Sequence, residues 1–107
     1  MSSVFEQIAK LAAIGEVKIS EHGYDELSAD GIFVRDVIAG LEQAEVLEEY
    51  PQFHKGPAVL VLEHDSEHRP FHVVWGIPKG EETPAVLVTA YRPDPIRWSS
   101  DFKSRKS

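Results

Sequence analysis

The sequence predicts a single α+β domain in which N-terminal helices pack on one face of a four-stranded antiparallel meander sheet. Three features predict this fold. Apolar residues recur at helical spacing up to residue 41, apolar and β-branched runs follow in a block, and the connections between those runs are short. Helices followed by a block of strands are typical of α+β domains. The 107 residues suffice for one domain, 1–107, and leave no room for a second.

Three helices are predicted in the first part of the chain. Their ranges are 3–15, 20–31 and 34–41, with a short extended piece at 17–19. The second helix has the clearest start, because Ser20 is a good N-cap residue. Ile19 and Tyr24 flank it at the positions of a hydrophobic staple.

Four strands and a closing helical turn are predicted after residue 41. The strand ranges are 44–50, 58–62, 71–77 and 84–92, and the helical turn covers 98–105. A polar turn at 64–69 joins the second and third strands, and Pro93 stops the last one. Short connections make neighbouring strands antiparallel.

Strand parity predicts which side chains share a face of the sheet. Phe71 and Trp75 belong to one face, and His72 belongs to the other. If the large apolar residues meet the helices, His72 points to the less covered face. Thr89 and Tyr91 of the last strand could then lie beside it, and a slip of one residue would reverse the assignment.

Composition excludes several kinds of protein. The chain has no cysteine, which excludes disulfides, thiolate metal sites and a cysteine nucleophile, and which suits a reducing compartment. No apolar run approaches the ~20 residues that a membrane span needs, and the acidic N-terminus does not resemble a signal peptide. We therefore expect a cytoplasmic protein with no membrane partner.

The net charge of −7 is unevenly distributed. Residues 1–50 hold three basic residues against eleven acidic ones, and residues 51–107 hold eight against seven. Acidic surfaces repel phosphate backbones, so any contact with nucleic acid must use the C-terminal half. The alternative is that the acidic residues only keep the protein in solution.

Two histidines, His64 and His68, have the spacing of metal ligands on a helix. They fall, however, between two predicted strands and beside Asp65 and Glu67, in a segment typical of a solvated turn. Two histidines without a third fixed ligand make a poor zinc site. We expect a turn, and no metal or other cofactor.

A set of four residues could perform proton transfer on RNA. His22 and His72 could act as acid and base, Tyr91 could position the substrate, and Arg92 could hold a phosphate through its planar fork. Cleavage of RNA without a metal needs a base for the ribose 2′-hydroxyl, an acid for the leaving oxygen and a cation. The alternative is structural: His22 caps or packs, and His72 forms hydrogen bonds within the sheet.

The C-terminal run offers a candidate surface for RNA. Trp98, Lys103, Arg105 and Lys106 combine an aromatic ring with cations, as surfaces that bind single-stranded nucleic acid do. The alternative is a solvated tail with Trp98 packed on the last strand.

Four segments resemble a known family. They are ISEHGYDELSADGI (19–32), EEYPQFHKGPAVLVLE (48–63), RPFHVVWGI (69–77) and VLVTAYRPDPIRW (86–98), with DFKSRK behind. Together they are similar to the domain of unknown function 4258 (DUF4258) family over residues 19–106. The most specific piece is a strand histidine followed by T-x-Y-x-P-D-P-x-x-W.

The resemblance implies a fold and a site. The family is similar to RelE-like and barnase-like ribonuclease toxins, with helices over a four-stranded antiparallel sheet. Some members resemble toxin halves of toxin–antitoxin pairs, which implies an antitoxin-like protein partner. The family's two histidines fall on His22 and His72, its Tyr-Pro pair on Tyr50 and Pro51, and its closing motif on Thr89, Tyr91, Pro93, Asp94 and Trp98.

One departure from the family pattern weakens the nuclease interpretation. Many members have arginine four residues after the helix histidine, and this chain has Glu26. Two hypotheses therefore remain. The first is a metal-independent endoribonuclease with RNA as its substrate, in which Thr89, Trp98, Lys103 and Arg105 bind the RNA. The second is a non-catalytic protein-binding module whose edge strand pairs with a partner or with a second copy in a homodimer.

Overall fold

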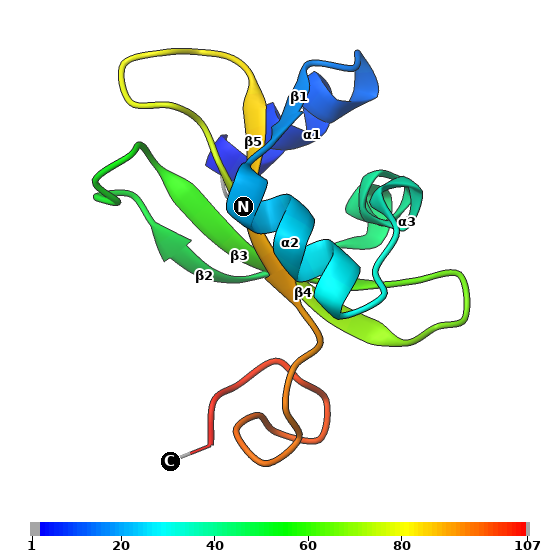
Figure 1. Cartoon of the computed structure of the whole chain (residues 1–107). Helices are drawn as coiled ribbons and strands as arrows, with labels where there is room; N and C mark the ends of the chain where they lie inside the picture. Colours follow the sequence, from blue (N-terminus) through cyan, green and yellow to red (C-terminus); the bar gives the residue numbers. More distant parts are fainter. Residues whose placement is uncertain (1–2, 107) are drawn as a thin grey trace.

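The fold is seen in a computed structural model that describes residues 3–106 (Figure 1). Three α-helices come first, with one short strand between the first two, and four longer strands follow. The elements are α1 (Ser3–Ala13), β1 (Val17–Ile19), α2 (Glu21–Ala29), α3 (Val34–Ala39), the 3₁₀ helix η1 (Gly40–Gln43), β2 (Glu45–Tyr50), β3 (Ala58–His64), β4 (Pro70–Gly76) and β5 (Ala85–Tyr91).

The sheet has five strands rather than the predicted four. Its order is β1-β5-β4-β3-β2, and β2 to β5 form the predicted antiparallel meander. The additional strand β1 pairs in parallel with β5, so the sheet is mixed. The prediction of a purely antiparallel four-stranded sheet was therefore wrong in this respect. A three-residue extended piece carries no pattern that reveals its partner, which lies near residue 85.

The helices partly follow the prediction. The Ser20 hydroxyl accepts a hydrogen bond from Gly23 N–H at 2.9 Å, which confirms Ser20 as the N-cap of α2. The third predicted helix divides into α3 and η1. The predicted helical turn at 98–105 was wrong: a bridge between Trp98 and Arg105 closes a loop there, with Phe102 at φ 61°.

One face of the sheet is buried under the helices. Phe71, Val73 and Trp75 of β4 are buried on it, as are Ile8 of α1 and Val37 of α3. The same core includes Leu11, Leu27, Ile32, Leu41, Val59, Val61, Ile77, Ala85, Leu87 and Ala90. We call this the helix face; its apolar burial is the main source of stability.

The opposite face, which we call the second face, carries His72, Val74 and Gly76 of β4 with their partners on the neighbouring strands. His72 lies opposite Tyr91, and Val74 lies opposite Thr89, which confirms the predicted neighbours. Within residues 3–106 no helix packs over the His72 end of this face, although the start of α2 lies beside Val86 and Val88 at the other end. Instead, the C-terminal segment 93–106 turns back below the sheet, apart from the helices (Figure 1, orange to red).

One carboxyl is buried on the helix face without a partner. Glu63 is 1% exposed, and neither of its side-chain oxygens has a hydrogen-bond partner. Burial raises the pKa of Glu63 to about 8, and the neighbouring Trp75 indole opposes part of that shift. Gly40 leaves room for this carboxyl, because a Cβ at that position would lie 2.6 Å from Glu63 Oε1. Glu63 is therefore held as a neutral acid at neutral pH.

Candidate functional site

His72 is the centre of a closed cluster on the second face. Its Nε2 lies 2.8 Å from the carbonyl oxygen of Phe102, and its Nδ1 lies 3.2 Å from the Tyr91 hydroxyl. The Trp98 ring packs edge-on against the imidazole, with centroids 4.4 Å apart. These partners come from β5 and the C-terminal segment, and His72 of β4 has no exposed surface.

The hydrogen bonds define the protonation state of His72. A carbonyl oxygen can only accept, so Nε2 carries the proton and donates it to Phe102. In the neutral ring Nδ1 then accepts from the Tyr91 hydroxyl. Burial lowers the pKa of His72, although the Phe102 carbonyl opposes that shift. His72 is thus a neutral imidazole with both nitrogens occupied.

The C-terminal segment is tied to β2 by ion pairs that close the cluster. Arg105 bonds Glu48 twice, at 3.0 and 3.2 Å, and its guanidinium lies 4.7 Å from the centre of the Trp98 ring. Lys103 pairs with Glu45 at 3.0 Å. Trp98, Lys103 and Arg105 were predicted to bind RNA. In this structure they fix the C-terminal segment over His72 instead, and both cations are paired with glutamates. Such exposed pairs are individually weak, so the buried Trp98 is the main anchor.

The same cluster includes a tyrosine of β2. The Tyr50 hydroxyl donates a hydrogen bond to Glu48 Oε1, and Arg105 holds the pKa of Glu48 below its usual value. Burial, helped by the Glu48 carboxylate, raises the pKa of Tyr50 to about 12. Tyr50 thus remains a phenol that fixes the carboxylate to which Arg105 binds.

Arg92 lies on the other side of the sheet from Tyr91. Its guanidinium donates to Asp65 Oδ2 at 2.8 Å and to the Pro70 carbonyl at 3.2 Å, and it lies over the Phe71 ring. Its backbone N–H donates to Asp30 at 2.8 Å. Arg92 therefore connects β5 to the β3–β4 turn through its side chain and to the end of α2 through its backbone N–H. It does not contribute to the His72 cluster.

His22 opens onto a separate cavity. Its side chain is 65% exposed, and Nε2 lies 3.7 Å from Glu26 Oε1, one turn further along α2. The cavity has a volume of about 360 Å³ and lies between the start of α2, the β2–β3 loop and the strands β4 and β5. Its lining consists of Ser20, His22, Phe53, Lys55, Gly56, Gly76, Ile77, Pro78, Val86 and Val88.

The two histidines do not share a contact. Gly76, the β4 residue in the cavity wall, is four residues from His72, and four residues of strand span roughly 13 Å. Thr89 lies between them on β5, opposite Val74. Tyr91, Trp98, Lys103 and Arg105 thus gather around His72, whereas His22 is separate and Arg92 lies on the helix face.

Sequence reasoning missed two residues that accompany His22. Phe53 and Lys55 come from the β2–β3 loop and line the same cavity. The signal was the HKGP segment before an apolar strand, in which Gly56 adopts φ 128° and turns the loop toward the end of β4. Only the pairing of β3 with β4 places that loop beside α2.

The structure also locates the proposed turn histidines. His64 ends β3 and His68 lies in the following turn at φ 64°. Among residues 3–106 no three His, Asp or Glu side chains come together to hold a metal ion. In the same range no helix has the length and apolarity to cross a bilayer.

Comparison with known proteins gives one match. The family model described as "Domain of unknown function (DUF4258)" matches residues 19–92, from the end of β1 to Arg92. No curated protein and no solved structure matches the chain. The match covers His22, the cavity wall, His72 and Tyr91, and it leaves out α1 and the C-terminal segment.

Proposed function

The chain belongs to the DUF4258 family, and we propose that it is a metal-independent endoribonuclease with His22 as its proton-transfer residue. One observation carries this proposal. An exposed imidazole, paired with a carboxylate, lies at the mouth of a cavity that also presents a lysine and an aromatic ring. A proton acceptor, a cation and a stacking surface are the groups that this cleavage uses.

The proposed reaction needs little else from the protein. His22 accepts the proton of a ribose 2′-hydroxyl, whose oxygen attacks the adjacent phosphorus. The bond from phosphorus to the 5′-oxygen breaks, and that oxygen takes a proton from solvent. The products are a 2′,3′-cyclic phosphate and a 5′-hydroxyl. Lys55 stabilises the charge on the phosphate during the attack.

Glu26 has a role in this scheme that an arginine could not perform. A carboxylate one helical turn after His22, with Oε1 3.7 Å from Nε2, is near enough to stabilise the charged form of the imidazole after proton transfer. Glu26 is thus a positioning residue, and the phosphate contact is assigned to Lys55, because Arg92 is engaged with Asp65.

The arrangement of the elements supports the same proposal. Helices on one face of the β2–β5 meander, with histidine and tyrosine on the opposite face, are the features on which the proposed likeness to RelE-like or barnase-like ribonucleases rests; the parallel strand β1 is an addition to that expectation. His72 and Tyr91 would join in catalysis after segment 93–106 moves away from the imidazole. Fold alone does not establish the activity, so the proposal depends on His22.

The test is RNA cleavage in the presence of a metal chelator. We expect purified protein to cut mixed RNA and to leave 2′,3′-cyclic phosphate ends. His22→Ala should reduce the rate by roughly 10² or more, the range found for general acid–base groups. His64→Ala is the matched control, because His64 is an exposed histidine at the end of β3, outside this cavity.

Two results would contradict the proposal. One is the absence of cleavage at any concentration of protein whose circular dichroism shows it folded. The other is equal activity of the wild type and His22→Ala. His72→Ala separates the two histidines: loss of activity in a folded, stable variant would assign a catalytic role to His72 as well.

A second function is favoured by the closed state of His72. A fully buried histidine with both nitrogens bonded serves structure, and β2 has an outer edge that no strand covers within residues 3–106. We therefore keep a protein-binding module as the alternative, with an antitoxin-like partner or a second copy added to β2. Size-exclusion chromatography with light scattering tests the homodimer, which Val46→Pro in β2 should then disrupt.

A further inference from the structure

The cavity beside His22 has an apolar floor and a cationic rim. The floor is formed by Val86 and Val88 of β5 with Ile77 and Pro78 at the end of β4. No carboxylate belongs to the lining as described for residues 3–106; its charged or ionisable members are His22 and Lys55. The cavity therefore suits a ligand with a flat apolar body and an anionic group.

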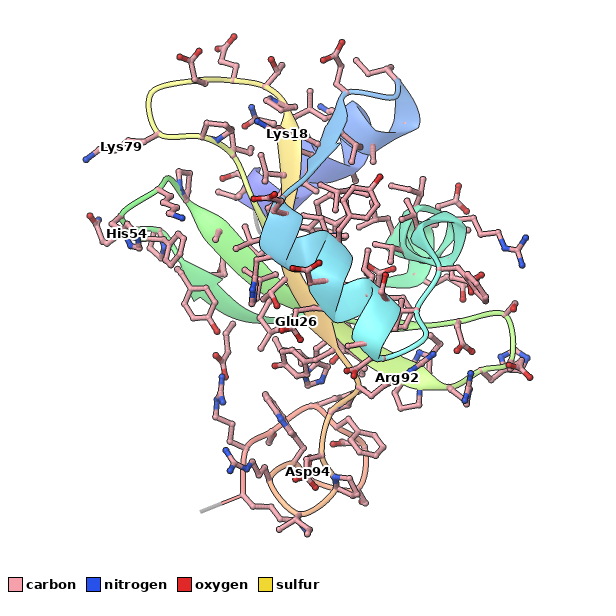
Figure 2. All side chains as sticks on the ribbon, viewed as in Figure 1. Lys18, Glu26, His54, Lys79, Arg92 and Asp94 are labelled. Carbon is pink, nitrogen blue, oxygen red and sulfur yellow. The ribbon has the colours of Figure 1, made fainter. Side chains whose placement is uncertain are left out.

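Further lysines surround this end of the second face. Lys18 of β1 lies opposite Val86 in the sheet register. Lys79 donates its backbone N–H to the Lys55 carbonyl at 2.9 Å, which brings the β4–β5 loop beside the β2–β3 loop. Figure 2 shows Lys18 and Lys79 at the same end of the molecule. Glu81 and Glu82 follow in the same loop as Lys79, outside the cavity lining.

These lysines differ from the C-terminal cations in being unpaired. Lys103 and Arg105 are held by Glu45 and Glu48. Lys18, Lys55 and Lys79 form no ion pair in the described part of the chain. Of these lysines, Lys55 lines the cavity, whereas Lys18 and Lys79 lie outside its lining. In a protein of net charge −7, an unpaired lysine beside His22, in a lining that holds no carboxylate among residues 3–106, favours an anionic ligand.

An aromatic platform completes the site. Phe53 lines the cavity, and its ring lies 4.7 Å from that of His54, centroid to centroid. Nucleobases stack on such rings, and base–aromatic stacking is largely independent of sequence. The volume of about 360 Å³ lies at the lower end of the range for small-molecule sites and accommodates one base with its sugar.

We propose that this cavity binds one nucleobase of RNA, stacked on Phe53 over the β5 valines, with the attached phosphate at Lys55. The inference rests on the proposed ribonuclease function and names the part of the substrate that the site holds. It also predicts little discrimination between bases. The Ser20 hydroxyl is already engaged, since it donates to Val88 O at 3.0 Å and accepts from Gly23 N–H. Purines should bind more tightly than pyrimidines, because they stack over a larger area.

The test is binding of mononucleotides to the full chain, followed by ¹H–¹⁵N NMR. AMP, GMP, CMP and UMP should shift the resonances of residues 53–56, 77, 86 and 88, with affinities that differ less than tenfold among bases. Phe53→Ala should weaken AMP at least fivefold, and Lys55→Ala should weaken AMP but not adenosine. Phe33→Ala is the control, because Phe33 is 60% exposed at the start of α3, away from the cavity.

A second variant protects the test against loss of folding. Val88→Phe fills the cavity from its floor and should abolish the AMP shifts while the dispersion of the spectrum is retained. Inorganic phosphate should shift the NMR resonance of Lys55 and leave the resonances of residues 86 and 88 unchanged. If AMP does the same, the site binds phosphate alone and the base pocket is refuted. If N-acetyltryptophanamide binds as tightly as AMP, the cavity takes a protein side chain and the proposal is overturned.

The two proposals fail in different ways. If Phe53→Ala cleaves RNA as fast as the wild type and the wild type does not bind AMP, the base pocket is refuted and the ribonuclease proposal stands. AMP binding that depends on Phe53, with no cleavage of any RNA, would leave a nucleotide-binding site and remove the ribonuclease.

Discussion

Replacement of Glu63 by glutamine should make the protein more stable above neutral pH. Glu63 is buried with both oxygens unpaired, and burial raises its pKa from 4.5 to about 8. Glutamine has nearly the same shape and does not titrate. The variant therefore removes the proton linkage while it keeps the packing beneath Gly40.

The direction follows from the two pKa values. A carboxyl with a raised folded pKa contributes stability that is fully present below its unfolded pKa, near 4.5, and is lost as pH rises toward 8. Each pH unit in that window costs about 1.4 kcal/mol. From pH 5 to pH 8 the wild type should lose roughly 3 kcal/mol relative to Glu63→Gln. Domains of this kind have a total stability of roughly 5–15 kcal/mol, so the effect is measurable.

Urea denaturation at several pH values between 5 and 8 measures this difference. The variant must be compared with the wild type at each pH, because titration of His72 also changes the stability with pH, and in the opposite direction to that of Glu63. The pKa of His72 is lowered, so the stability that it contributes is lost as pH falls below its unfolded pKa, near 6.5. Glu49→Gln, an exposed glutamate of β2, is the control and should run parallel to the wild type. Parallel curves for Glu63→Gln would refute a neutral, unpartnered Glu63.

Three further changes test other contacts. Ser20→Ala should cost about 1 kcal/mol in chemical denaturation through loss of the α2 N-cap bond, and an unchanged midpoint would contradict that role. Arg92→Met should cost about 2 kcal/mol at pH 7 through loss of the ion pair with Asp65. The cost should be smaller at pH 3, because Arg92 is one of the groups that lower the pKa of Asp65, and without it the carboxyl takes up a proton more readily and leaves no unpaired buried charge. Equal losses at the two pH values would count against the ion pair. Trp98→Ala should expose His72, so its modification by diethyl pyrocarbonate, followed by mass spectrometry, should rise at least fivefold; an unchanged rate would mean that Trp98 is not the cover.

The sequence was sufficient for the meander and for the face of His72. Alternation in β4 places Phe71, Val73 and Trp75 together, and these residues are buried under the helices. Tyr91 was predicted to lie beside His72, and the antiparallel pairing of β4 with β5 places it there, although the long loop 77–84 joins these two strands. Patterns of period two determine these features locally, so they could be read from the residues.

A bulge was not visible in the sequence. The register shifts between Val74 and Trp75, so Leu87 lies on the helix face although simple alternation groups it with Thr89 and Tyr91. The bulge leaves Val88 unpaired within the ladder, and Val88 becomes part of the cavity wall. The apolar and β-branched residues of β5 fit a register with the bulge as well as a register without it. Their alternation alone therefore could not locate the bulge.

The site residues were only partly predictable for a related reason. The residue types of His72, Tyr91 and Trp98 suggested chemistry, but their burial depends on a C-terminal loop whose conformation rests on a residue at positive φ, Phe102. Sequence periodicity contains no information on such loops. The partner of Arg92 was equally hidden, because Asp65 is 27 residues away in the chain.

The parallel strand β1 changes the border of the sheet. Residues 3–18 precede the matched family range, and through β1 they convert β5 from a border strand into an interior one. The new border at β1 is three residues long, too short to recruit another chain by backbone pairing. Lateral growth of the sheet is thereby directed to β2, whose sequence EVLEEY carries three glutamates. Glu45 and Glu48 are already paired with Lys103 and Arg105, so within residues 3–106 Glu49 is the β2 glutamate left for a lysine or arginine of an added chain.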